Sequence, residues 1–148
     1  MEMKETLAIA SDHAGYEMKL SIIDYVRSKG YEVFDFGTDS AEAVNYPDFG
    51  HPLAEAIEAG RFRLGLTLCG SGNGINMVTN KHQGIRGALC WNKEISRLAR
   101  YHNDANICSM PARFIDLKTA KEIVDAFLDT GYEGGRHEIR IKNIPIHK

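Results

Sequence analysis

The sequence predicts an α/β protein, a three-layer α/β/α sandwich around a mostly parallel five-stranded sheet. Three observations favour this fold. Short apolar runs alternate along the chain with longer segments of helical periodicity, and glycines close many of the connections between them. The chain also has 148 residues, 43% of them hydrophobic and 26% charged, which suits one domain with an ordinary core. We therefore expect a single domain over residues 1–148, with a basic tail from about residue 134.

The first half of the chain predicts two strands and two helices. Apolar runs indicate the strands, and apolar residues spaced by three or four positions and followed by a glycine indicate the helices. The predicted elements are a strand at 7–10, a helix at 18–28, a strand at 32–36, a loop at 37–50 and a helix at 53–59.

The second half continues the alternation and supplies three more strands. The predicted elements are strands at 64–68, 87–90 and 105–110, with helices at 92–101 and 117–128. A further helix is expected to begin after the loop that follows the third strand. The tail from residue 134 has little helical pattern, and the order of the strands in the sheet stays open.

Residues 64–76 are the most informative part of the chain. A short apolar run ends at Cys69, and glycines then alternate with Ser71 and Asn73 before the expected helix. A strand, a glycine-rich loop and a helix in this order present backbone N–H groups to an anion. Because this loop also carries a thiol and a hydroxyl two residues apart, it predicts an enzyme that acts on a negatively charged small molecule.

The glycine loop has two other interpretations, a simple strand–helix turn and a nucleotide-binding loop. Glycines that merely close a strand–helix turn would give the same pattern, and the loop alone leaves that interpretation open. Nucleotide binding fits less well, because a dinucleotide fingerprint needs G-x-G-x-x-G after the first strand and a P-loop needs G-K-[ST]. The spacing here is G-x-G-x-G after the third strand, and G-K-[ST] is absent.

Polar residues also follow the first predicted strand, where Asp12 and His13 stand. In a Rossmann-like sandwich, ligands bind beyond the carboxyl ends of the strands. If the first and third strands are neighbours, Asp12 and His13 face the same crevice as the Cys69 loop. Taken alone, the pair is also typical of a helix cap with a solvated imidazole.

The tail and the end of the fourth helix carry further candidates. Arg136 and Arg140 are four residues apart, a spacing that puts them on one face, so together they could hold a phosphate. A solvated basic tail is the alternative. The run His102-Asn103-Asp104 is an ordinary composition for a helix C-terminus.

Composition and charge exclude several functions. A net charge of −2 gives no field for holding nucleic acid or an acidic membrane, and no apolar run is long enough to span a bilayer. Three cysteines without a C-x-x-C pair, in a chain without a secretory pattern, predict a reduced, cytoplasmic protein. Cys90 and Cys108 lie in apolar runs and are expected in the core. No histidine or cysteine spacing indicates a metal site.

Taken together, the polar motifs resemble those of the ribose-5-phosphate isomerase B family, which includes galactose-6-phosphate and allose-6-phosphate isomerases. The resemblance covers nearly the whole chain. It rests on A-S-D-H-A-G at 10–15, Y-P-D at 46–48, C-G-S-G-N-G-I at 69–75, N-K-H-Q-G-I-R at 80–86, H-N-D-A-N at 102–106 and Y-E-G-G-R-H at 132–137. It implies a sugar-phosphate aldose–ketose isomerase without metal or organic cofactor. It also implies a homodimer with sites between subunits, and leaves tetramers open.

The resemblance assigns three catalytic roles. Cys69 matches the family's carbon base, and a nearby helix N-terminus would favour its thiolate. In the family's other branch a glutamate just after the loop is the base, but Ile75 stands at that position and cannot accept a proton. Ser71 is expected to relay protons between the enediolate oxygens, and His102 matches the residue that opens the sugar ring.

The resemblance also assigns the substrate-binding residues. Backbone N–H groups of the loop are expected to hold the enediolate oxygens, and three further residues the sugar hydroxyls. The expected set is Asp12, His13, Gly70, Ser71, Gly72, Asn73, Gly74 and Asn103 for the sugar, and Arg113, Arg136 and Arg140, assisted by His137, for the phosphate.

The expected reaction is the interconversion of ribose 5-phosphate and ribulose 5-phosphate through an enediolate. One alternative is a hexose-6-phosphate isomerase of the same family. A second is a non-catalytic sugar-phosphate sensor, although a sensor would need only the phosphate clamp and not the thiol, hydroxyl and histidine.

Overall fold

The computed structural model describes residues 4–146 and contains a five-stranded sheet in the order β2-β1-β3-β5-β4. All paired strands are parallel, which confirms the predicted sandwich. The elements along the chain are β1 (Thr6–Ser11), a 3-10 turn η1 (His13–Gly15), α1 (Tyr16–Ser28), β2 (Glu32–Asp35), α2 (Pro47–Glu58), β3 (Gly65–Cys69), α3 (Asn73–Thr79), β4 (Gly87–Leu89), α4 (Lys93–Asn103), β5 (Ile107–Pro111), α5 (Leu117–Asp129) and α6 (His137–Lys142).

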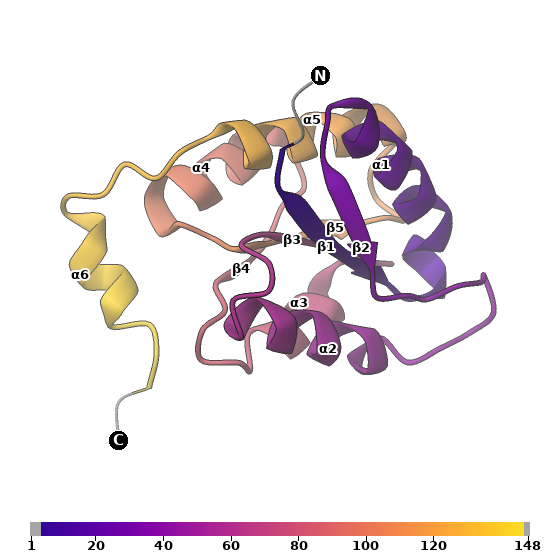
Figure 1. Cartoon of the computed structure of the whole chain (residues 1–148), viewed down its shortest axis with the longest axis horizontal. Helices are drawn as coiled ribbons and strands as arrows, with labels where there is room; N and C mark the ends of the chain where they lie inside the picture. The colour runs from indigo at the N-terminus through magenta and orange to yellow at the C-terminus, as the bar shows by residue number, and fades with distance from the viewer. Residues whose placement is uncertain (1–3, 147–148) are drawn as a thin grey trace.

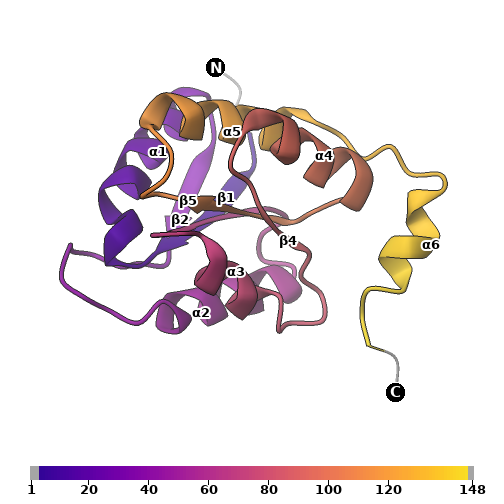
Figure 2. The same ribbon diagram turned by 180° about the vertical axis from the view of Figure 1, so that it is seen from behind.

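Helices cover both faces of the sheet (Figure 1). α1, α4 and α5 lie on one face, and α2 and α3 lie on the other, as the reverse view also shows (Figure 2). Alternate residues of β1 divide between the two resulting cores: Leu7 and Ile9 pack under α1 and α5, whereas Ala8 and Ala10 pack against α2. The three central strands, β1, β3 and β5, are therefore buried on both sides, as expected for a parallel sheet, whereas the edge strands β2 and β4 are more exposed.

The sheet places two of the predicted polar clusters, the pair Asp12 and His13 and the Cys69 loop, at the same end of its strands. Ser11 of β1 is in register with Leu68 of β3, so Asp12 and Cys69 both lie at the carboxyl ends of neighbouring strands. The first and third strands are thus neighbours, which is the condition under which Asp12 and His13 were expected to face the Cys69 loop. This arrangement also puts both clusters where open parallel sheets bind ligands.

Two helices differ from the sequence-based expectation. α2 begins at Pro47, within the predicted loop, because proline suits the first position of a helix and the residues after it pack on the sheet. The tail contains α6, which was not predicted because only His137 of its six residues is buried, so no apolar periodicity marks it.

The tail stands apart from the sandwich. α6 lies beyond the end of α4, away from the sheet (Figures 1 and 2). Three isoleucines of this segment are exposed: Ile139 at 68%, Ile144 at 54% and Ile146 at 69%. Between residues 4 and 146, no helix has the length and apolarity needed to cross a membrane.

Candidate active site

Cys69 is the last residue of β3 and is 5% exposed. The loop that follows turns into α3 at Gly72, whose φ of 76° lies in the left-handed region. A side chain there would also meet Leu89, since an added Cβ would lie 2.5 Å from its Cδ1. Gly72 is thus required for the turn. The first N–H groups of α3 have no acceptor within the helix. That of Asn73 donates to Ser71 Oγ at 3.3 Å, whereas those of Gly74 and Ile75 have no partner among the described residues and are available to an anion beside the thiol.

A side chain that was not assigned a role from the sequence borders the loop. Tyr46, just before α2, lies so close to Gly74 that an added Cβ would be 2.5 Å from its ring carbon Cζ. The tyrosine is 38% exposed and forms a wall of the loop. The only signal for it in the sequence is the Tyr-Pro-Asp motif at 46–48, which carried no chemical role of its own.

Asp12 and His13 have partners within the chain. Asp12 Oδ1 accepts hydrogen bonds from the N–H groups of Ala14 and Gly15, at 2.9 and 3.2 Å, so the capping interpretation holds for this atom. His13 Nδ1 accepts from the Val44 N–H at 3.1 Å, which draws the loop before α2 toward the site. Asp12 Oδ2 and His13 Nε2 have no partner among the described residues and can face a ligand.

The start of the same loop is anchored by a buried lysine. Lys19 of α1 is fully buried, and its Nζ donates to Asp35 Oδ1 and to the Thr38 carbonyl, both at 2.7 Å. Asp35 also accepts the Gly37 N–H at 2.8 Å. This ion pair fixes the loop that carries Val44 and Tyr46 to the edge of the sheet.

Arg113 brings positive charge to the glycine loop. Its N–H donates to the Gly70 carbonyl at 3.0 Å, and an added Cβ at Gly70 would lie 3.2 Å from its Nη1. No carboxylate within residues 4–146 pairs with its exposed guanidinium. Arginine forms bidentate hydrogen bonds with phosphate, so a phosphorylated ligand beside Cys69 would find a partner here.

A buried polar network holds the loop from behind. Thr67 Oγ1 and Ser109 Oγ are 2.6 Å apart, and Ser109 Oγ donates to Asn76 Oδ1 at 3.0 Å. Both hydroxyl residues are fully buried. The network therefore links β3, β5 and α3 and sets the position of α3 relative to Cys69.

Ser109→Ala is expected to lower the free energy of unfolding by about 1–3 kcal/mol, because it leaves Thr67 and Asn76 without a partner. Urea unfolding measures this loss. Ser96→Ala is the matched control: it removes a buried hydroxyl that donates to the Ile123 carbonyl at 2.8 Å in the other layer. Only Ser109→Ala should also change the kinetic constants. A variant as stable as the unmodified protein would show that the network contributes nothing.

The other two cysteines are structural. Cys90 and Cys108 are fully buried, as expected from their apolar surroundings. A hydrogen bond from the Cys108 thiol to Cys90, together with burial, raises the pKa of Cys108 well above its ordinary value. Cys69, by contrast, lies at the carboxyl end of β3, beside the glycine loop.

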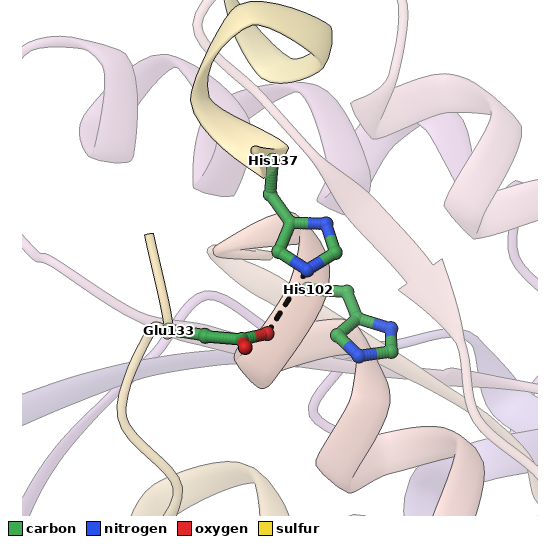
Figure 3. A group of neighbouring side chains, drawn as sticks. All are labelled: His102, Glu133 and His137. Atoms are coloured by element: carbon green, nitrogen blue, oxygen red, sulfur yellow. Dashed lines mark hydrogen bonds and ion pairs between the residues drawn. The ribbon is translucent and has the colours of Figure 1, made fainter. Parts of the chain in front are cut away.

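The remaining predicted residues form a second group at the end of α4. His102 stacks on His137, with ring centroids 4.6 Å apart and an angle of 21° between the ring planes. His137 Nε2 lies 3.0 Å from Glu133 Oε2 (Figure 3). Arg136 lies 3.8 Å from the same carboxylate and is largely exposed, and Arg140 is also exposed.

The group around Cys69 and the group around His102 lie at opposite ends of the strands of the sheet. β5 starts at Ile107, just after His102 and Asn103, and ends at Pro111, which is in register with Cys69. A strand of five residues spans about 13 Å at about 3.3 Å per residue. One chain therefore does not bring Cys69 and His102 together, and the resemblance places both in one site only between two subunits.

Comparison with known proteins identifies the family. The model of the Ribose/Galactose Isomerase family matches residues 7–144. The chain belongs to this family. Ribose-5-phosphate isomerase B of Escherichia coli is 39% identical over 138 residues, which cover 93% of each chain. The resemblance inferred from the motifs is thus confirmed.

Solved structures of this family agree with the fold. Ribose 5-phosphate isomerase B from Thermotoga maritima is 46% identical, with a TM-score of 0.93 over 95% of this chain and 97% of that one. The enzyme from Mycoplasma genitalium, solved with bound ribulose 5-phosphate, is 36% identical, with a TM-score of 0.91 over 97% and 95% of the two chains. These family members share the whole of the sandwich described above.

Proposed function

We propose that this protein is a ribose-5-phosphate isomerase that interconverts ribose 5-phosphate and ribulose 5-phosphate. The observation that carries the proposal is a buried thiol, Cys69, beside two α3 N–H groups and the Arg113 guanidinium, none of which has a partner within residues 4–146. A base, oxyanion donors and a phosphate partner are the groups that such an isomerisation requires. The named family members act on or bind the same sugar phosphates.

In the proposed mechanism, Cys69 as thiolate removes the proton from C2 of the open-chain aldose. The electron pair moves into the C1–C2 bond, and the aldehyde oxygen becomes an enediolate oxygen. N–H groups of residues 70–74 stabilise its charge, and Ser71, exposed at the loop, exchanges protons between the two oxygens. The thiol then returns the proton to C1. Ile75 is fully buried and has no acid–base group, so the base is Cys69.

We further propose that the site is shared between two subunits. Cys69 and His102 lie at opposite ends of the strands of one sheet, so a partner must supply His102 for both to act on one substrate. The projecting α6 and the residues after it, with exposed Ile139 and Ile144, suit contact with a neighbouring chain. A homodimer related by a two-fold axis would form two such sites.

Within this site, the residues keep the roles expected from the resemblance. Cys69, Ser71 and His102 are catalytic. Asp12, His13 and Asn103 hold sugar hydroxyls, and three arginines, with His137, hold the phosphate. In this proposal, residues 1–148 form one cytoplasmic isomerase domain. It needs no cofactor and binds neither nucleic acid nor membrane. The full set is Cys69, His102 and Ser71 with Asp12, His13, Gly70, Gly72, Asn73, Gly74, Asn103, Arg113, Arg136, His137 and Arg140.

The proposal is tested by measuring turnover of ribose 5-phosphate and of allose 6-phosphate under the same conditions. Faster turnover of ribose 5-phosphate, judged by kcat/KM, supports the assignment. Faster turnover of allose 6-phosphate would instead identify a hexose-6-phosphate isomerase. Binding of both without turnover would identify a sensor.

Arg136→Ala is expected to raise KM for ribose 5-phosphate about ten-fold or more, because a charge-assisted hydrogen bond contributes roughly 1.5–3 kcal/mol. Inhibition by inorganic phosphate should weaken in parallel. Arg97→Ala is the matched control, since Arg97 is also exposed and paired with a glutamate but lies on α4 away from the tail. An unchanged KM with ordinary phosphate inhibition would support a solvated tail.

A further inference from the structure

Three side chains from separate segments meet at the base of α6. His102 is in the last turn of α4, Glu133 is in the connection after α5, and His137 begins α6. Their ligand atoms all lie within 4.8 Å of one another (Figure 3). In the part of the chain that the structure describes, no other group of three or more histidines, cysteines and acids meets this condition.

Two of these side chains already form a pair, and the third is free to join them. His137 is 6% exposed, and its Nε2 lies 3.0 Å from Glu133 Oε2. His102 contacts the rings of Tyr101 and His137, but neither of its nitrogens has a hydrogen-bond partner among the described residues. An imidazole with unused nitrogens thus lies beside a preformed histidine–carboxylate pair.

We infer that His102, Glu133 and His137 form a binding site for a borderline divalent metal ion, with Zn²⁺ as the ion that fits best. Two imidazole nitrogens and one carboxylate oxygen are a known zinc ligand set, which leaves a fourth position for water or another ligand. Hard Mg²⁺ prefers oxygen ligands and retains its water, so it does not suit these donors.

Binding requires a small rearrangement. A metal ion bonds to an imidazole in the plane of the ring, so two stacked rings cannot both point to one ion. Donor atoms around tetrahedral zinc are about 3.4 Å apart, given bonds of about 2.1 Å. His102 is the residue that turns, because it is only half buried and its nitrogens are free, whereas Glu133 holds His137 in place.

The consequence for activity rests on the proposed function, in which His102 opens the sugar ring. A nitrogen bound to zinc can no longer accept or donate a proton, so zinc inhibits the enzyme. Arg136 lies 3.8 Å from Glu133 and opposes the binding of a cation by its charge.

Metal binding is tested first without substrate, by calorimetric titration of Zn²⁺ into the full chain. The titration uses Cys69→Ala protein, so that this thiol cannot bind the ion. We expect one zinc ion per chain, with affinity at least ten-fold lower when Glu133→Gln or His137→Ala is added. His51→Ala is the matched control, because it removes one imidazole of another histidine pair, in which His51 Nδ1 lies 2.7 Å from His82 Nε2. Equal affinity in all proteins, or loss only with His51→Ala, would overturn the inference.

Inhibition is tested second, in protein with Cys69 intact. Formation of ribulose 5-phosphate is followed directly by NMR, because coupling enzymes can themselves respond to zinc. Zn²⁺ should inhibit and Mg²⁺ at the same concentration should not. Glu133→Gln should be active without zinc and need at least ten-fold more zinc for half-inhibition. Inhibition that this variant does not change would place the ion elsewhere and contradict the inference. Zinc binding by a protein without isomerase activity would refute the proposed function and leave the metal site standing.

Discussion

Cys69→Ala is expected to lower kcat for ribose 5-phosphate by about 10²–10⁴-fold, the usual effect of removing a general base. Because the thiol acts only as the proton moves, kcat and kcat/KM should fall together while KM changes little. The fold should survive, since alanine fits the space at the end of β3 and the turn depends on Gly72 rather than on the thiol.

The measurement needs a control that separates catalysis from stability. Cys90→Ala is suitable, because Cys90 is also a buried thiol but lies next to Cys108 in the core. It should lower the melting temperature and leave kcat per folded molecule unchanged. If folded Cys69→Ala protein turned over substrate at a near-normal rate, Cys69 would not be the base.

Most of the fold could be predicted from the local pattern of apolar residues. The errors of that prediction have physical reasons. The central strands β1, β3 and β5 are buried on both faces and show as apolar runs, and the more exposed edge strands β2 and β4 were found from shorter apolar runs. Strand order could not be predicted, because it depends on packing between segments distant in the sequence. The start of α2 was missed because Pro47 in a polar segment indicates a turn as readily as a helix. α6 was missed because it buries almost nothing in its own chain.

Some residues of the candidate site could also be predicted from the sequence, and others could not. The Cys69 loop could be predicted because its strand, glycines and helix are consecutive. Asp12 was predicted beside it only on the condition that the first and third strands are neighbours, which the structure shows. The position of His102 at the other end of the strands could not be predicted, since the motifs say nothing about distance. Glu133 received no role, because a single carboxylate just before the basic tail has no spacing that marks it. Its proximity to His102 appears only in the folded chain.

The central claim, a site shared between subunits, is tested by mixing two inactive proteins. One chain carries Cys69→Ala and the other His102→Ala, and each homodimer alone should be nearly inactive. The two are unfolded together, refolded and compared with each protein treated alone. Differential tags allow the heterodimer to be isolated and verified.

If the site is shared, a heterodimer holds one site with both defects and one site that is fully native. Random pairing makes roughly half of the dimers heterodimers, so the mixture should regain at most about a quarter of the unmodified activity. Purified heterodimers should reach about half, by the same count of sites. If Cys69 and His102 of the same chain formed the site, every site would carry one defect. Verified heterodimers with no more activity than the two parent proteins would therefore contradict the shared site.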